Sequence, residues 1–198
     1  MSPVQAGRPL QTEDAGVLDR RDCEVELVGS RLHEPDAPSV RGATAQLGCG
    51  IGFASQVALL GGQARSDGER TEALALVGKT ALRPLTDEQA GIVIAWALGA
   101  DRPAGGSLRH ETTEIRLVAT QPIGPWLLHA NLGATRSERE RLDRTLFSAA
   151  VERTGLGPVD AMAEVFGDDR SDAWLNGALR WSVNDGHRRA WRQVAPIG

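Results

Sequence analysis

The sequence predicts an α+β protein, in which a mostly antiparallel sheet packs against two or three helices in the C-terminal third of the chain. Three observations support this prediction. Short segments between residues 23 and 132 alternate apolar with polar residues, which is typical of strands with one face in water. Two later segments repeat their apolar residues every three or four positions, which is typical of helices. A last alternating segment predicts a closing hairpin at the C-terminus.

Length and composition favour one folded domain. The chain has 198 residues, of which 41% are hydrophobic and 24% are charged, and these values are close to the average of globular proteins. One hydrophobic core is sufficient at this length. Residues 1–19 are polar and contain Pro3, Gly7 and Pro9, so we expect a flexible N-terminal tail there and a single globular domain over residues 20–198.

The first strand is predicted over residues 23–28, where apolar and charged residues alternate. Residues 43–64 are apolar and rich in glycine, which argues against one continuous helix. Two alternatives stay open for this segment. It forms either two strands joined by a turn, or a strand, a tight turn and a helix over residues 53–60.

Further strands are predicted along the middle of the chain. Residues 74–82 form a short apolar run that ends before Pro84. A β-branched cluster favours a strand over residues 92–98, although Thr86 and Gln89 have the spacing of a helix capping box. Residues 114–120 and 126–132 predict two strands on either side of a proline-containing turn.

The first helix is predicted to begin near Arg136, because Thr135 and Glu138 have capping-box spacing. Gly155 is expected to end it. A second helix is predicted from Pro158 to Phe166, since proline suits the first helical position. The apolar residues of the first helix that share one face are Leu142, Leu146, Ala149 and Ala150.

The C-terminal hairpin is predicted from alternation over residues 179–183, with Asp185 and Gly186 in the turn and a second strand over residues 189–194. A helix over residues 172–181 is the competing interpretation. Gly177 in its middle weighs against it.

The glycines Gly48, Gly50 and Gly52 follow an apolar segment and precede a second apolar run. This pattern is similar to the first motif of class I S-adenosylmethionine-dependent methyltransferases. The resemblance implies that the three glycines let the backbone approach the cofactor, and that Asp67 binds its ribose hydroxyls. The resemblance covers residues 45–67 only, and Gln46 stands where most of the family has an acidic residue.

The C-terminal segment contains the candidate residues of a partner-binding surface. Tryptophan and arginine are common at protein interfaces, and five tryptophans in a chain with three phenylalanines and no tyrosine are an unusual number. We call the predicted site the Trp-rich surface. Its members are Trp174, Trp181, Trp191, Arg188 and Arg189.

The four histidines and two cysteines have no metal-ligand spacing, so no metal site is predicted. Cys23 and Cys49 are expected to be reduced thiols, because a chain of this length does not need a disulfide. The formal net charge of −4 argues against nucleic acid as a partner. No stretch approaches the roughly 20 apolar residues of a membrane-spanning helix, so we expect a cytoplasmic protein without membrane contact.

The sequence identifies no catalytic residues and no cofactor, and it does not decide whether the protein is an enzyme. The first functional hypothesis is a soluble intracellular binding or accessory domain. It would hold a protein partner, a second copy of itself or a small ligand on its sheet or on its Trp-rich surface. The alternative is a small methyltransferase-like enzyme that uses Gly48, Gly50, Gly52 and Asp67.

Overall fold

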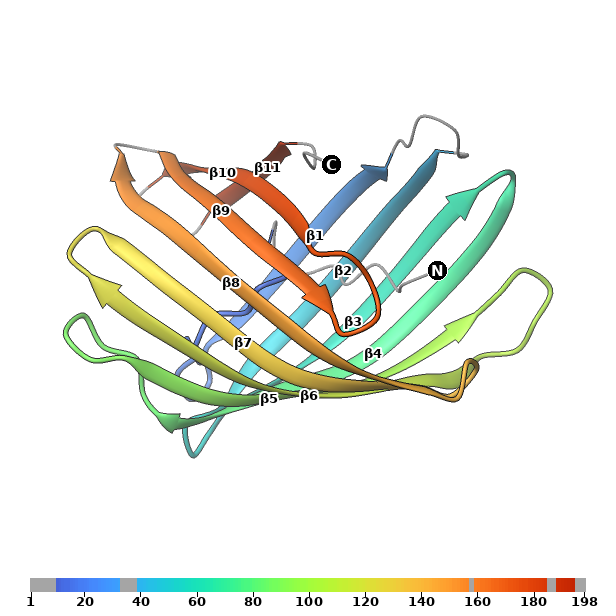
Figure 1. The fold of residues 1–198 in the computed structure, drawn as a ribbon, viewed down its shortest axis with the longest axis horizontal. Coiled ribbons are helices and arrows are strands. Elements are labelled where there is room, and N and C mark those ends of the chain that lie inside the picture. Colours follow the sequence, from blue (N-terminus) through green and yellow to red (C-terminus); the bar gives the residue numbers. More distant parts are fainter. Residues whose placement is uncertain (1–9, 33–38, 157–158, 185–187, 195–198) are drawn as a thin grey trace.

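The computed structural model describes residues 10–32, 39–156, 159–184 and 188–194. They form one antiparallel sheet of 11 strands, in which each strand pairs with the strand that follows it in the chain. Figure 1 shows this sheet curled into a trough. The strands are β1 (Cys23–Leu32), β2 (Val40–Gly52), β3 (Ser55–Ser66), β4 (Glu69–Arg83), β5 (Gly91–Arg102), β6 (Arg109–Ile123), β7 (Trp126–Ser137), β8 (Leu142–Leu156), β9 (Val159–Asp168), β10 (Trp174–Asn184) and β11 (Arg188–Val194).

The predicted α+β class is wrong. The described part of the chain consists of strands and connecting segments and contains no helix. No helix long and apolar enough to cross a membrane is found among these residues. The antiparallel pairing was predicted correctly, but the sheet extends through the C-terminal third as well.

The helices predicted to begin near Arg136 and Pro158 are the strands β8 and β9. In β8, Ser148 and Ala150 are buried on one face, whereas Phe147 and Ala149 are exposed on the other. Because apolar residues occupy both faces, the two-residue period is hidden and a helical spacing emerges by accident. Pairing with β7 and β9 satisfies the β8 backbone along most of its length, and this outweighs the local helix signals.

The glycine-rich segment forms two strands, β2 and β3, so the alternative with a helix over residues 53–60 is wrong. The predicted strands of the C-terminal hairpin are confirmed, with Trp181 opposite Ala190 in the β10–β11 pair. The helix over residues 172–181 is therefore excluded. The predicted turn at Asp185 and Gly186 lies outside the described residues.

Cys23 and Cys49 form a disulfide, so the expectation of reduced thiols is wrong. The two residues lie directly opposite each other in the β1–β2 pair, with Cα atoms 4.1 Å apart. This proximity depends on the register of the hairpin and not on the separation of the cysteines in the sequence. The disulfide ties the first strand of the sheet to the second.

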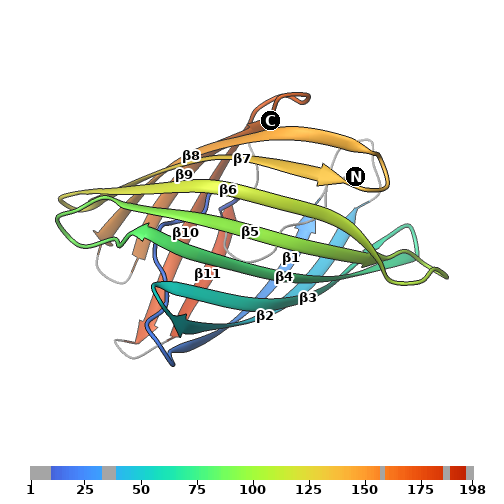
Figure 2. The same cartoon turned by 90° about the horizontal axis from the view of Figure 1, so that it is seen from below.

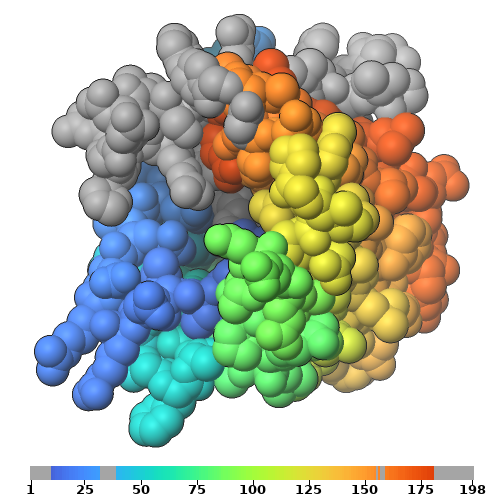
Figure 3. Space-filling view, turned by 90° about the vertical axis from the view of Figure 1, so that its left-hand side faces the viewer, coloured from blue at the N-terminus to red at the C-terminus, as the bar shows by residue number. Residues whose placement is uncertain are grey.

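The two faces of the sheet have different neighbours. We call the face that contacts residues 10–22 the inner face, and the opposite face the outer face. Figure 3 shows the strands arranged around a hollow. The edge strands β1 and β11 both lie on the far side in Figure 2. Within the described residues, no pairing joins these two edges.

Candidate functional site

The inner face is unusually polar for a buried surface. Polar and charged residues outnumber apolar ones among the buried side chains of the described chain. The buried apolar residues are mostly small, and the apolar cluster consists of Ala15, Val93 and Val118. The buried polar residues are Thr12, Gln56, Lys79, Thr120, His129, Asn131, Ser148, Glu152, Glu164 and Asn176.

Residues 10–22 cross this face, and Glu164 in β9 anchors their start. Its carboxylate accepts hydrogen bonds from the backbone N–H groups of Gln11, at 2.9 Å, and Thr12, at 2.8 Å. The Thr12 hydroxyl donates to the same carboxylate at 2.8 Å. Asn176 in β10 donates a fourth hydrogen bond at 2.8 Å. These donors compensate the burial of the charge.

The next anchors come from β7 and β4. The Asn131 side chain is oriented so that its amide oxygen and its amide nitrogen both form hydrogen bonds. The oxygen accepts from the N–H of Glu13 at 2.6 Å, and the nitrogen donates to the carbonyl of Glu13 at 3.1 Å. Lys79 is the only lysine in the sequence and is 5% exposed. Its ammonium lies 3.4 Å from the Asp14 carboxylate and 3.6 Å from that of Glu13.

Two further strands hold the middle of the segment. In β6, the Thr120 hydroxyl accepts from the N–H of Ala15 at 2.8 Å and lies 2.9 Å from Nδ1 of His129. In β3, Gln56 accepts from the N–H of Leu18 at 2.7 Å. Residues 11–18 therefore pass from β9 to β3 across the trough, and inner-face side chains satisfy their backbone groups.

The end of the segment passes over Gly50 in β2. Arg20 and Gly50 form an isolated β-bridge, and the N–H of Gly50 donates to the carbonyl of Asp22 at 2.9 Å. A Cβ atom on Gly50 would overlap the backbone oxygens of Leu18 and Asp19. Only glycine permits this approach of two backbones.

A second charged network lies on the same face beyond the segment. Arg180 in β10 donates to Asp160 at 2.7 Å and also contacts Glu152 in β8. The other Glu152 oxygen lies 3.9 Å from Nε2 of His129. His129, which lies in an apolar strand, is thus a buried residue with polar partners.

A cavity of about 120 Å³ separates residues 10–13 from the inner face of β1–β6. Its charged lining contains more carboxylates than cations, so it suits water and small polar solutes. No group of three or more potential metal ligands in the described chain is placed to hold a metal ion. The charged residues that line the cavity are Glu13, Glu24, Glu26, Glu114, Lys79 and Arg116.

The outer face has the opposite character. Within strands β1–β9, its central positions carry no charged side chain. Large apolar side chains from adjacent strands meet in register and remain exposed. One such row consists of Val25 (68% exposed), Leu47 (55%), Leu59 (53%), Leu76 (45%) and Leu98 (45%).

Charged residues gather where the strands end. In the loop between β7 and β8, Arg139 donates to Asp101 at 2.6 Å, and this hydrogen bond raises the pKa of Arg139 above its usual range. At the opposite end, the guanidinium of Arg153 lies 5.3 Å from the centre of the Trp126 ring. The apolar outer surface is therefore a band bordered by charge.

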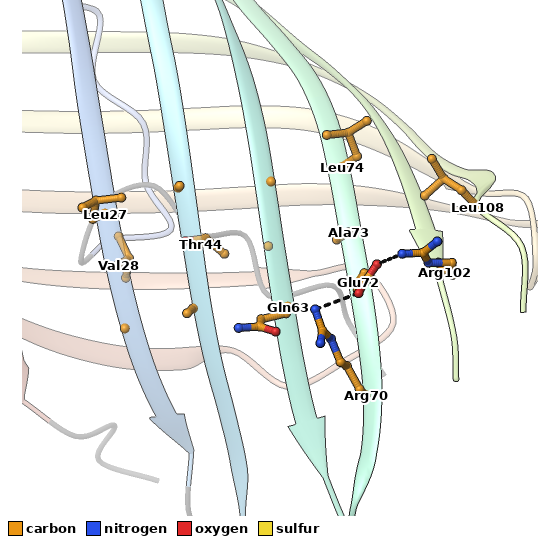
Figure 4. A pocket seen from close by; sticks show the side chains of 15 residues that line it. Leu27, Val28, Thr44, Gln63, Arg70, Glu72, Ala73, Leu74, Arg102 and Leu108 are labelled. Atoms are coloured by element: carbon orange, nitrogen blue, oxygen red, sulfur yellow. Dashed lines mark hydrogen bonds and ion pairs between the residues drawn. The ribbon is translucent and has the colours of Figure 1, made fainter. Parts of the chain in front are cut away.

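An open hollow of about 810 Å³ lies on the outer face near one end of this band (Figure 4). Its floor consists mainly of glycine and alanine from β1–β3, and Leu27 and Leu74 lie at its sides. Glu72 pairs with Arg70 and Arg102 at its polar end. These ion pairs already satisfy its charged groups.

The residues assigned to a cofactor site are not brought together. Gly48, Gly50 and Gly52 lie in a strand between two antiparallel neighbours, and no helix follows them. Gly52 and Asp67 flank opposite ends of β3, whose 12 residues span about 40 Å. Asp67 has a φ of 51° and precedes Gly68 in a tight hairpin turn, a position that Asp-Gly favours.

The residues of the predicted Trp-rich surface lie in the last two strands. Trp174 and Trp181 belong to β10, and Trp174 is 45% exposed. Trp191, Arg188 and Arg189 belong to β11. The strand pairing brings Trp191 opposite Arg180 and Arg189 opposite Ser182.

Nothing in the composition of residues 10–22 predicts that they bind the sheet. A signal for the inner face is present in β7, where His129 and Asn131 alternate with Leu128, Ala130 and Leu132. This alternation predicts a strand correctly. The alternation does not show which of the two sets of side chains is buried. In this strand the polar set, His129 and Asn131, is the buried one.

No protein-family model matches the chain, and no curated protein and no solved structure shows a significant similarity to it.

Proposed function

We propose that this protein is embedded in a lipid bilayer, where its outer face contacts hydrocarbon and its inner face lines a pathway for small polar solutes. One observation carries the proposal. The exposed outer face is apolar, while the shielded inner face holds the buried charges. In water, the opposite arrangement is expected for a sheet with one solvated face.

The dimensions of the apolar band support this environment. In β4 the uncharged outer positions run from Leu74 to Leu82, and in β7 they run from Trp126 to Ala134. Each of these segments has the length of about 9–11 residues that a tilted strand needs to cross a bilayer. Trp126 lies at the border of the band, where tryptophan is enriched in membrane proteins.

Exposure of these apolar side chains to water is energetically unfavourable. Burying one large aliphatic or aromatic side chain stabilises a protein by about 1.5–3 kcal/mol. In water, the exposed side chains of the row from Val25 to Leu98 and of its neighbours do not contribute this stabilisation. Contiguous apolar patches on water-exposed proteins rarely exceed a few hundred Å². Hydrocarbon around the band removes this unfavourable exposure.

The proposal departs from the expectation of a cytoplasmic protein. That expectation rested on the length of an apolar helix, whereas a strand needs fewer residues and exposes only alternate side chains to lipid. The Cys23–Cys49 disulfide adds support, because disulfides persist in oxidising compartments.

The proposal also requires that the edge strands be paired in the bilayer. An unsatisfied backbone group in hydrocarbon costs several kcal/mol, so β1 and β11 must pair with each other or with another chain. We expect slow hydrogen exchange in vesicles for the β1 amides that point away from β2. Fast exchange at these amides would count against insertion.

Replacing Leu132 by arginine tests the proposal. Leu132 is 60% exposed and lies between Leu117 and Phe147 on the outer face. In a bilayer, an arginine at Leu132, one outer position from the centre of the uncharged β7 segment, is expected to lower the free energy of unfolding by about 2–4 kcal/mol. The measurement is urea unfolding of the chain reconstituted in phosphatidylcholine vesicles.

Thr145→Arg is the matched control, since Thr145 is also exposed but lies at the border of the band, opposite Ala134 and two positions from Asp143. We expect it to change stability by less than about 1 kcal/mol. If the chain stays out of vesicles and both variants are equally stable, the outer face does not meet lipid. A protein partner would then be the better explanation of the apolar band.

A further inference from the structure

We propose that residues 10–22 are a displaceable plug that closes the polar interior. This inference rests on the proposed function and adds a mode of regulation to it. The plug would block the pathway when bound to the inner face and open it when released.

The contacts of the segment indicate how it is held. Apart from the bridge at Arg20, residues 10–22 belong to no β-ladder. Side chains from separate strands instead bind its backbone, as Glu164, Thr120 and Gln56 do. Each of these hydrogen bonds can be exchanged for one with water when the segment leaves.

The apolar side chains that attach the segment to the cluster are small. Ala15 belongs to the buried apolar cluster, and Val17 packs against it. All pairings between strands of the sheet are formed without this segment. Its release would therefore leave the strand pairing intact.

The segment also lies where it can block passage. It crosses from β9 to β2, which is most of the width of the trough, and it forms one wall of the 120 Å³ cavity. The remaining lining includes Glu24, Glu26 and Gln46, which are polar and stay on the sheet. Without the plug, these side chains would line a wider water-filled space.

The test compares the protein with its Glu164→Ala variant in phosphatidylcholine vesicles. Losing the charge-assisted hydrogen bonds to Gln11 and Thr12 should raise amide exchange in residues 11–18 by about tenfold or more. Amides of β6 and β7 should keep their protection. The entry rate of arabinose, measured by vesicle swelling, should increase several-fold.

Two further variants keep the test decisive. Thr120→Val removes a different anchor, the acceptor of the Ala15 N–H, and should have the same effects on exchange and swelling. It replaces Glu164→Ala in the test if that variant does not fold. Glu138→Ala changes a carboxylate in the β7–β8 loop and should change neither exchange nor swelling.

The outcomes separate the plug from the proposed function. Vesicle flotation reports insertion, and hydrogen exchange reports release of the segment with or without lipid. Unchanged protection of residues 11–18 in both anchor variants would overturn the plug. Release of the segment in inserted protein without faster arabinose entry would overturn it as well.

Discussion

Gly50 shows how a single residue can have a role other than the one its motif predicts. The glycines at positions 48, 50 and 52 resemble a cofactor loop, and a close backbone approach does occur at Gly50. The approaching group is the chain's own backbone at Leu18 and Asp19. The resemblance implied a close approach to a cofactor at these glycines and not to this partner, because the partner lies in a segment without a recognisable pattern.

Substitution of Gly50 by alanine tests this role. The added methyl group would overlap backbone atoms, which cannot move aside as a flexible side chain can. We expect destabilisation by about 1–3 kcal/mol together with loss of exchange protection in residues 11–18. Gly61→Ala is the control, since a Cβ there meets nothing within 4 Å. Equal stability of the two variants would contradict the close approach.

At the level of elements, strands up to Leu132 could be predicted from local signals, which are alternation in residues 23–28, an apolar run in residues 74–82 and a β-branched cluster in residues 92–98. β8 and β9 could not. Their inner faces mix apolar residues with Ser148, Glu152 and Glu164, and their outer faces are also apolar. The two-residue period of apolar residues is therefore weak in these strands. The capping-box spacing of Thr135 and Glu138 favoured a helix instead. Pairing between strands, which local sequence does not encode, decided the structure.

The Cys23–Cys49 disulfide provides a test at this level. It fixes the first strand at the edge of the sheet across a sequence separation of 26 residues. Replacing both cysteines by serine should lower the free energy of unfolding by about 2–4 kcal/mol. The measurement is urea unfolding with and without reductant. Reductant should destabilise the parent protein and leave the double variant unchanged, and any other pattern would show that the bond does not stabilise the fold.

At the level of the whole molecule, the net charge of −4 gives no information about where the charges lie in the structure. Among the described residues, charges gather inside the trough and at the strand ends, and the central outer positions of β1–β9 have none. Composition averages these regions, so the candidate site could not be predicted from it. The long-range contacts of residues 10–22 were equally hidden, because Thr12 and Glu164 are 152 positions apart in sequence.

The most direct test of the outer face measures the depth of Trp96 in a bilayer. Trp96 lies in β5, in the middle of the apolar band of the outer face, with its ring over Gly78. In a variant whose other four tryptophans are phenylalanine, phosphatidylcholine brominated in the middle of its acyl chains should quench Trp96 fluorescence strongly. Acrylamide, which stays in water, should quench it weakly. Strong quenching by acrylamide and none by brominated lipid would contradict the proposal that this face meets hydrocarbon.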